Sequence, residues 1–411
     1  MAYAPSLIRL TLADAQQALH EGDLSRANRL LQRLHAAGHA DAASHQMLAI
    51  ISLKLGFFDQ ARRHMEAARQ LIQPSDRRER FLVIRAWGAG FWADVLHTIH
   101  GLALAEASGR TPIVHWGLEC RYRRAGIENA WPLYFEPVSP HTIATAEVEG
   151  LSIFPPKWTG TNLRALRVNK DDGEWSSLSG LYLLNRPEHI TVFDFFTELE
   201  DLAPWFAPGH PLATDTEAEL GRLYRRHLRL THDLEEELDR AEAAMIGRRP
   251  TIAIHYRTQS YQKIMTETPD RKGLGPELFA KAVDRYLASH PDAGVYLTTD
   301  FTPAVIYFRE RYRDRLSCRE VTRVARVEEQ SVELQQRHDG VTLAREVLID
   351  TFLATRCDAF VGDSASGLSQ AIAKLKDWLP ESVTLFRPGY AAPAGQLRRY
   401  SDPSPWWNPT N

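Results

Sequence analysis

The chain has 411 residues, of which 44% are hydrophobic and 25% are charged, an ordinary balance for a globular protein. This balance excludes a fully disordered chain, a collagen and a coiled-coil rod, and the length predicts two to three domains. The 49 Lys and Arg residues against 52 Asp and Glu residues leave a formal charge of -3. Such a charge argues against a dedicated nucleic-acid binder, because those proteins normally carry a basic excess.

Cysteine usage and the first residues indicate a reducing compartment. Cys120, Cys318 and Cys357 lie far apart and form no CxxC pair, so we expect neither a disulfide framework nor a thiolate zinc site. The first residues contain no basic segment followed by an apolar one, and no window approaches the roughly 18 apolar residues of a membrane span. We therefore expect a soluble cytoplasmic protein without a membrane span.

Residues 1–75 contain a repeat of helix, short glycine turn and helix. The repeated positions are Leu19, Gly22, Leu24, Ala27 and Leu31, which recur as Leu53, Gly56, Phe58, Ala61 and Met65. This pattern resembles the tetratricopeptide repeat; the alternative is an ordinary four-helix region with coincidental spacing. Solenoids usually need at least three repeats, so we expect the segment to pack on the rest of the chain or to form a dimer.

A first α/β unit begins near residue 80. An apolar run at 81–84, the glycines Gly88 and Gly90, a helical stretch at 91–109 and a second apolar run at 112–116 follow in order. Strand, glycine turn, helix and strand predict a βαβ unit. The turn would offer amide N–H groups to an anion at a helix N-terminus, or it only permits tight packing.

The middle of the chain has a different composition. Residues 120–215 are rich in tryptophan, proline and glycine, and residues 216–247 are charge-laced and predict a single bridging helix. Aromatic side chains such as Trp158 and Trp205 would stack on sugar rings if they are exposed near a cleft. The alternative is that they pack loops onto the core.

A second α/β unit begins at residue 248. Predicted strands at 251–254, 294–300, 359–362 and 383–386 alternate with predicted helices at 276–289, 301–313, 343–355 and 364–375. The alternation predicts a mostly parallel sheet with a site at the carboxyl ends of its strands. His255, Arg257, Asp300 and Ser364 all fall at or just past such ends, and this convergence predicts a binding cleft.

The residue types at these ends suit a nucleotide. Arg257 offers a planar fork of donors to phosphate, or forms a structural ion pair. His255 would bond a base or ribose, or be a satisfied structural histidine. Asp350, on an otherwise apolar helix face, would accept two N–H bonds from a purine edge, or lie on the helix surface. Ser364 and Ser366 would cradle phosphate together with helix amides, or only cap the helix. No spacing predicts a metal site, and no Walker A motif occurs.

Together these motifs resemble the α-1,6-fucosyltransferase family, which includes rhizobial nodulation fucosyltransferases and the core fucosyltransferases of animals. The family pattern is His-x-Arg after a strand, a Lys-x-x-Thr-Glu stretch, an Asp after the next strand, an Asp-bearing helix and a serine turn. The matching residues over about 80–390 are His255, Arg257, Lys263, Thr266, Glu267, Asp300, Asp350 and Ser364 or Ser366, with Gly88 and Gly90 as the N-terminal glycine turn. Two departures are Thr258, where the family usually has a second arginine, and Lys263, which follows two residues later than usual.

The resemblance implies a fold and an activity. The fold is α/β, a GT-B glycosyltransferase with two Rossmann-like halves after a small all-α tetratricopeptide-like region. Its parts would be the helices at 1–75, an acceptor-side half at 80–247 and a donor-binding half at 248–411. The implied activity is inverting, metal-independent transfer of fucose from GDP-fucose to a glycan or glycolipid-like acceptor, with no other cofactor.

The resemblance also implies roles for residues. Arg257 and the serine turn, Ser364 and Ser366, would stabilise the departing diphosphate. Glu267 would be the base that takes the acceptor's proton, with Lys263 orienting it or touching phosphate, unless the two form only a solvated ion pair. His255 and Asp350 would bind guanine or ribose, and Asp300, Gly88 and Gly90 would complete the donor site.

Two other functions compete with this one. The same fold accommodates a glycosyltransferase that uses another nucleotide sugar. A non-catalytic helical-repeat interaction protein is the second alternative, favoured by Thr258 in place of the second arginine. The acceptor, the linkage and the oligomeric state stay open, as does a protein partner for the N-terminal helices.

Overall fold

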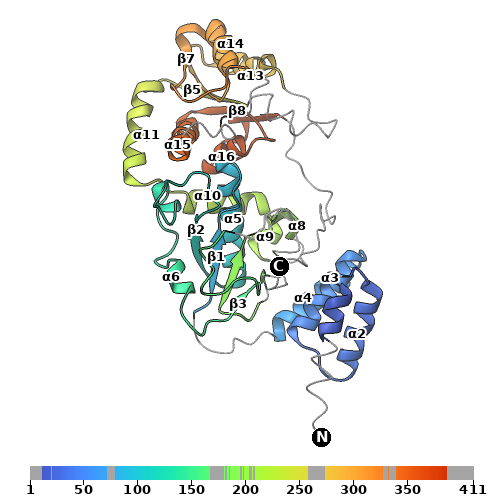
Figure 1. Ribbon diagram of the computed structural model, residues 1–411. Helices are drawn as coiled ribbons and strands as arrows, with labels where there is room; N and C mark the ends of the chain where they lie inside the picture. The colour runs from blue at the N-terminus through green and yellow to red at the C-terminus, as the bar shows by residue number, and fades with distance from the viewer. Residues whose placement is uncertain are drawn as a thin grey trace.

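The structure is a computed structural model and describes most of the 411 residues. The described ranges are 12–19, 21–71, 79–166, 180, 183–184, 186–194, 197, 199–202, 206, 209–257, 274–326, 332 and 339–386. Figure 1 shows three parts in chain order, a group of helices followed by two α/β halves. Thr258, Lys263 and Glu267 lie outside the described residues, so what was predicted for them stays a prediction.

The N-terminal part contains α2 (Leu24–Ala36), α3 (Ala42–Lys54) and α4 (Phe58–Leu71). Equivalent positions of the repeat share conformation and burial. Gly22 and Gly56 precede α2 and α4 with φ of 76° and 78°, a region that glycine adopts without strain. Ala27 and Ala61 are fully buried where helices meet. Helix, glycine turn and helix are therefore as expected, and assignment to the tetratricopeptide repeat stays a prediction.

The first α/β half contains a four-stranded parallel sheet in the order β2-β1-β4-β3. Its strands are β1 (Phe81–Arg85), β2 (Thr111–His115), β3 (Ile153–Phe154) and β4 (Ile190–Phe193). The first two lie within a residue of the predicted positions. The other two arise from the stretch rich in tryptophan, proline and glycine, where no strand was expected. Every residue of β1 and β4 is buried, as is usual where helices or loops cover both faces of a parallel sheet.

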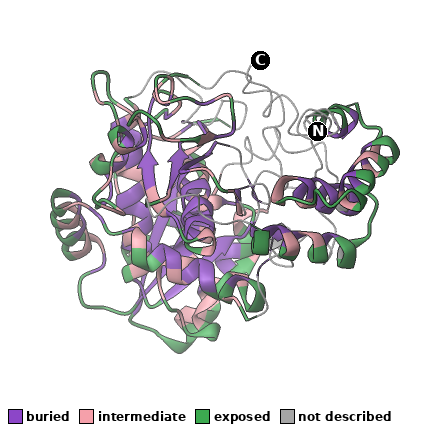
Figure 2. Ribbon diagram, turned by 90° about the horizontal axis from the view of Figure 1, so that it is seen from below, coloured by how far each residue is buried: buried purple, intermediate pink, exposed green. Residues whose placement is uncertain are grey.

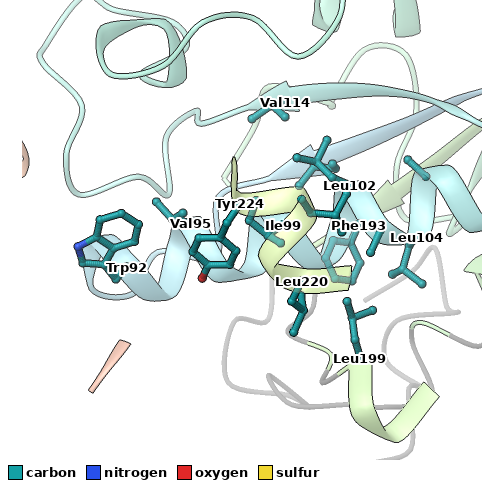
Figure 3. Close-up of a cluster of buried hydrophobic side chains, with 14 of the residues drawn as sticks. Trp92, Val95, Ile99, Leu102, Leu104, Val114, Phe193, Leu199, Leu220 and Tyr224 are labelled. Atoms are coloured by element: carbon teal, nitrogen blue, oxygen red, sulfur yellow. The ribbon is translucent and has the colours of Figure 1, made fainter. Parts of the chain in front are cut away.

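Helix α5 (Phe91–Ser108) packs closely on this sheet and ends at Gly109, which has a φ of 60°. A Cβ on Gly101 would lie 2.8 Å from the Ile84 side chain, so this glycine lets the helix approach β1. Figure 3 shows α5 residues such as Ile99 beside Phe193 of β4 and Tyr224. Short helices follow: α6 (Ile143–Ala146), α8 (Leu199–Leu202) and α9 (Pro211–Thr214).

The single bridging helix expected over 216–247 is wrong, because the chain forms two helices there. Helix α10 (Thr216–His227) ends before α11 (His232–Met245) begins. Between them Leu228 and Leu230 are both buried, and Leu230 forms an isolated bridge with Phe135. Burial at every second residue belongs to extended backbone, and this pairing interrupts the helix.

The second half contains a five-stranded parallel sheet in the order β7-β6-β5-β8-β9, which together with the first sheet confirms the predicted α/β class. The strands are β5 (Thr251–Tyr256), β6 (Gly294–Thr299), β7 (Leu316–Ser317), β8 (Ala359–Asp363) and β9 (Val383–Phe386). The helices are α13 (Pro276–Ser289), α14 (Thr302–Tyr312), α15 (Gly340–Arg356) and α16 (Gly367–Leu375). All predicted elements of this half occur within about three residues of their expected ends.

The two halves contact each other through several helices. Trp92 Nε1 on α5 donates to Thr351 Oγ1 on α15 at 3.1 Å. Arg345 on α15 forms ion pairs of 2.7 Å with both Asp233 and Glu237 on α11. Figure 2 shows buried residues gathered in the strands and in the helices beside them, with exposed residues on the outer turns. Within the described ranges, no helix is long and apolar enough to cross a bilayer.

Candidate functional site

A cleft lies at the middle of the second sheet, where the strands that follow β5 in the chain are added first on one side of it and then on the other. From β5 the chain moves through β6 to β7 on one side, then returns to β8 and β9 on the other. Ligands of such sheets bind beyond the carboxyl ends of the strands at this point. The cleft there encloses about 610 Å³, a volume that includes the solvent at its mouth. Its walls are formed by Tyr122, His255, Arg257, Thr298, Thr299, Asp300, Val321, Thr322, Val332, Leu343, Glu346, Val347, Asp350 and Leu368.

The cleft brings together four of the residues predicted from the sequence: His255, Arg257, Asp300 and Asp350. They come from the ends of β5 and β6 and from α15. Tyr122, from the loop after β2 of the first half, also lines the cleft. A loop of the first half and the strand ends of the second half therefore contribute to the same cleft.

Arg257 and Asp300 form the charged edge of the cleft. Arg257 Nη1 lies 3.5 Å from Asp300 Oδ2, and the two side chains are 15% and 17% exposed. This separation is longer than that of a hydrogen-bonded ion pair, so the contact is mainly Coulombic. Arg257 therefore forms the ion pair that was one of the two expectations for it. Its side chain also lines the cleft, where the guanidinium can contact an anion.

His255 is a buried, neutral histidine beside this arginine. Its exposed fraction is 2%, and its Nδ1 lies 2.6 Å from Ser369 Oγ on α16. Burial, with a further contribution from the Arg257 charge, lowers the pKa of His255 to about 3. Ser369 Oγ also accepts the Asp363 N–H at 3.1 Å, which ties the end of β8 to the ring. A neutral imidazole can bond a base or ribose without adding charge.

Asp350 is buried between α15 and the sheet and is not on the helix surface. Its Oδ1 accepts from Tyr296 Oη at 3.1 Å and from Arg319 Nη1 at 2.8 Å, and its Oδ2 accepts from Thr298 Oγ1 at 3.3 Å. Burial raises the pKa of Asp350, against the opposing effect of the Arg319 charge. The carboxylate therefore already joins α15, β6 and the loop after β7 before any ligand binds.

Glu346 lies one helical turn before Asp350, and the carboxyl groups of these two residues form the acidic wall of the cleft. It accepts from Thr322 N at 3.0 Å and from Thr322 Oγ1 at 3.3 Å. Arg319 Nη1 donates to the Glu346 carbonyl at 3.1 Å and thereby joins the two acids. Sequence reasoning missed Glu346, Arg319 and Ser369, because nothing in their local spacing indicates which strand or loop they contact.

The serine turn leads into the N-terminus of α16. Ser364 N donates to Phe386 O at 3.1 Å, and its hydroxyl donates to the same carbonyl at 3.4 Å. Ser366 is the N-cap of α16, but its side chain makes no capping hydrogen bond. The first-turn amides at 367–369 thus receive no acceptor from the cap, and Leu368 among them lines the cleft. The positive end of α16 can bind an anion there.

The glycine turn of the first half is already occupied by a side chain. Gly88 has a φ of 85°, and Gly88 N and Ala89 N donate to Asp94 Oδ1 at 2.8 and 3.2 Å. Asp94 is fully buried, which raises its pKa to about 7 against the opposing effects of the backbone amides and Arg121. Gly90, the N-cap of α5, has no side-chain capping bond. A donor-binding role for Gly88 and Gly90 stays a prediction.

Within the part of the chain that the structure describes, no three His, Cys, Asp or Glu side chains are grouped so as to hold a metal ion. The aromatic residues Phe154, Trp158 and Phe206 of the middle segment are at most 6% exposed. For these three the packing alternative is therefore confirmed. Trp205 lies outside the described residues.

Comparisons with known proteins give matches among solved structures alone, since neither a protein-family model nor a curated protein matches the chain. The α-1,6-fucosyltransferase NodZ soaked with GDP-fucose matches at 17% identity and a TM-score of 0.49, covering 72% of this chain and 93% of that one. The fucosyltransferase NodZ from Bradyrhizobium matches at 18% and 0.49, with the same coverage. POFUT1 in complex with GDP-fucose matches at 12% and 0.49, covering 76% and 99%. Identities and TM-scores at this level assign neither a family nor an activity to the chain.

Proposed function

We propose that the protein is a glycosyltransferase of GT-B architecture that transfers fucose from GDP-fucose to a hydroxyl of a glycan acceptor. We further propose that transfer inverts the anomeric carbon without a metal, that the protein works in the cytoplasm, and that its N-terminal helices are tetratricopeptide-like. The observation that carries the proposal is the cleft between the halves, in which Arg257, neutral His255 and the open N-terminus of α16 surround one space.

The acidic wall suits a guanine base. Guanine presents two adjacent N–H donor groups on its Watson–Crick edge, whereas adenine presents one amino group there. Carboxylate oxygens accept such donors in pairs. Asp350 already accepts three hydrogen bonds within the protein and Glu346 accepts two, so the base would use the remaining acceptor sites of these two carboxylates, each of which offers about four. This arrangement favours GDP over a nucleotide whose base has fewer donors.

The charged edge suits the diphosphate. When the bond between the anomeric carbon and the diphosphate oxygen breaks, the electron pair stays on the phosphate and negative charge develops there. Fixed donors that are already oriented stabilise that charge without reorganising. Arg257 and the first-turn amides of α16 supply such donors, and Arg257 lies 3.5 Å from Asp300, close enough for that carboxylate to restrain it.

The acceptor hydroxyl attacks the opposite face of the anomeric carbon and must lose its proton during attack. In this proposal Glu267 takes that proton and Lys263 orients the carboxylate. Both belong to the segment after Arg257, and their part in the reaction rests on the sequence resemblance alone. A Glu267→Gln variant is expected to bind GDP as the wild type does and to turn over about 100-fold more slowly or worse.

The test is calorimetric binding of GDP, UDP, ADP and GDP-fucose to the purified full chain in the presence of EDTA. Selective binding of GDP and GDP-fucose supports the proposal, and release of GDP from GDP-fucose on addition of a glycan acceptor completes it. A preference for UDP or ADP would instead identify a glycosyltransferase with another donor. Binding of none of the four would support the interaction-protein alternative and overturn the proposal.

A further inference from the structure

We propose that Arg121, which belongs to the first half, is a second cation for the diphosphate of the donor. The inference rests on the proposed function and deepens it. Its consequence is that the phosphate subsite is shared between the halves. Nucleoside binding would then depend on the second half alone, whereas diphosphate binding would require both.

The need for another cation follows from the charges of the cleft. The described residues that line it include three carboxylates, Asp300, Glu346 and Asp350, but only one cation, Arg257. Arg319 lies behind the wall, where it pairs with Asp350 at 2.8 Å and with Glu237 at 3.5 Å. A helix N-terminus contributes only about half a unit charge. Among the described lining residues, a diphosphate at the charged edge would therefore meet Arg257 together with Asp300, a pair without net charge.

Arg121 lies beside the cleft, next in the chain to one of the residues that line it. It directly precedes Tyr122, which lines the cleft, and its backbone carbonyl abuts Gly340 at the start of α15. Its Nε donates to Gly88 O at 2.9 Å, so the guanidinium rests on the glycine turn at the start of α5. That helix meets the N-terminus of α16, because a Cβ on Gly367 would lie 3.4 Å from Trp92 Cβ.

The Arg121 guanidinium is also available to a ligand. The residue is exposed, and within the described part of the chain its side chain makes one hydrogen bond, through Nε. The two Nη groups, which form the planar fork that binds phosphate, make none there. Asp94, fully buried beneath the turn, bonds Gly88 N and attracts the guanidinium. The turn thus fixes the position of Arg121 through Nε and does not use the two Nη groups.

The neighbouring arginines of the same loop are placed differently. Arg123 Nη1 donates to Ile127 O at 2.7 Å and so turns back into its own loop. Arg124 is exposed and interacts electrostatically with Asp339, the N-cap of α15. Arg124 therefore offers a matched control: it carries the same charge, lies in the same loop, and has a carboxylate of its own.

The experiment measures the dissociation constants of GDP and guanosine for the full chain and for Arg121→Ala, Arg121→Lys and Arg124→Ala. We expect Arg121→Ala to weaken GDP binding by about 10- to 100-fold, the range of a charge-assisted bond to phosphate, and to leave guanosine binding unchanged. Arg121→Lys should lose less, because a point charge remains. Arg124→Ala should change GDP binding by less than about threefold, since only long-range charge is lost.

Two outcomes overturn the inference, and they differ from failure of the proposed function. Equal GDP affinity in the wild type and in Arg121→Ala would remove Arg121 from the site. Equal weakening of GDP and guanosine in Arg121→Ala would show a structural effect on the turn, a result that thermal unfolding of the same variant would report as well. Failure of the proposed function is seen in the wild-type chain itself, as absence of GDP binding.

Discussion

The two α/β halves contain the same local arrangement but place it differently relative to the cleft. Each has a parallel sheet in which a buried strand leads through a tight turn into a helix at the interface. In the first half the carboxylate of Asp94 accepts the turn amides of Gly88 and Ala89. In the second half the buried carboxylate of Asp363 accepts Ala365 N at 3.0 Å, and Ser366 leaves the first turn of α16 without a side-chain cap, next to the cleft. Both turns therefore hold a buried carboxylate, and they differ in that the described lining of the cleft includes a first-turn residue of α16 but none of α5.

The largest effect is expected on the open side of this comparison. Arg257→Ala removes the guanidinium beside the open helix end and should lower turnover of GDP-fucose by about 10²- to 10³-fold, the cost of one oriented donor to a developing anion. GDP release in single-turnover experiments measures this. Arg285→Ala, an exposed arginine on α13, is the matched control and should have no effect. Comparable loss in both variants would contradict a local role for Arg257.

An intermediate effect is expected in the first half, at the glycine turn that Asp94 occupies. Asp94→Ala leaves the two amide groups of the first turn without their acceptor and should lower the free energy of unfolding by about 2–3 kcal/mol. Asp94→Asn keeps one oxygen acceptor and should lose less at neutral pH. Urea unfolding of the three proteins measures the difference. Little change in Asp94→Ala would mean that the turn does not depend on this carboxylate.

Comparison of the wild type with Asp94→Asn also tests the ionisation of Asp94. Its pKa is raised from 3.8 to about 7, so between these values the folded state binds more protons than the unfolded state. The wild type should therefore lose stability as pH rises from about 4 to about 7, relative to Asp94→Asn, in which the group does not titrate. A constant difference in unfolding free energy across this range would contradict the raised pKa.

The smallest effect is expected from the residue that joins the open turn to His255. Ser369→Ala removes the partner of His255 Nδ1 and of Asp363 N, and should cost about 1 kcal/mol of stability and weaken guanosine binding only a few-fold. Calorimetry and urea unfolding measure the two quantities. Ser382→Ala, at a half-buried serine just before β9, is the control. Unchanged nucleoside binding would separate His255 from the base or ribose.

The sequence predicted what depends on local pattern. Apolar runs and turn residues located β6 and β9, and the rule for parallel sheets predicted that His255, Arg257 and Asp300 would meet. It missed β4, whose four residues lie in a segment of unusual composition. It also missed Arg319, whose partners Asp350 and Glu237 lie 31 residues away or more and meet it only through packing. That Asp94 occupies the glycine turn was equally invisible, because an acid in a first helical turn is common.

Gly340 packs so closely against the first half that there is no space for a larger side chain. A methyl group there would overlap the carbonyl of Arg121, so no larger residue fits without moving the two bodies apart. Alanine, serine and valine at this position would move α15 away from the loop that carries Tyr122 by increasing distances. An engineer could thus widen the entrance of the cleft in small steps from one position, without altering any side chain that lines it.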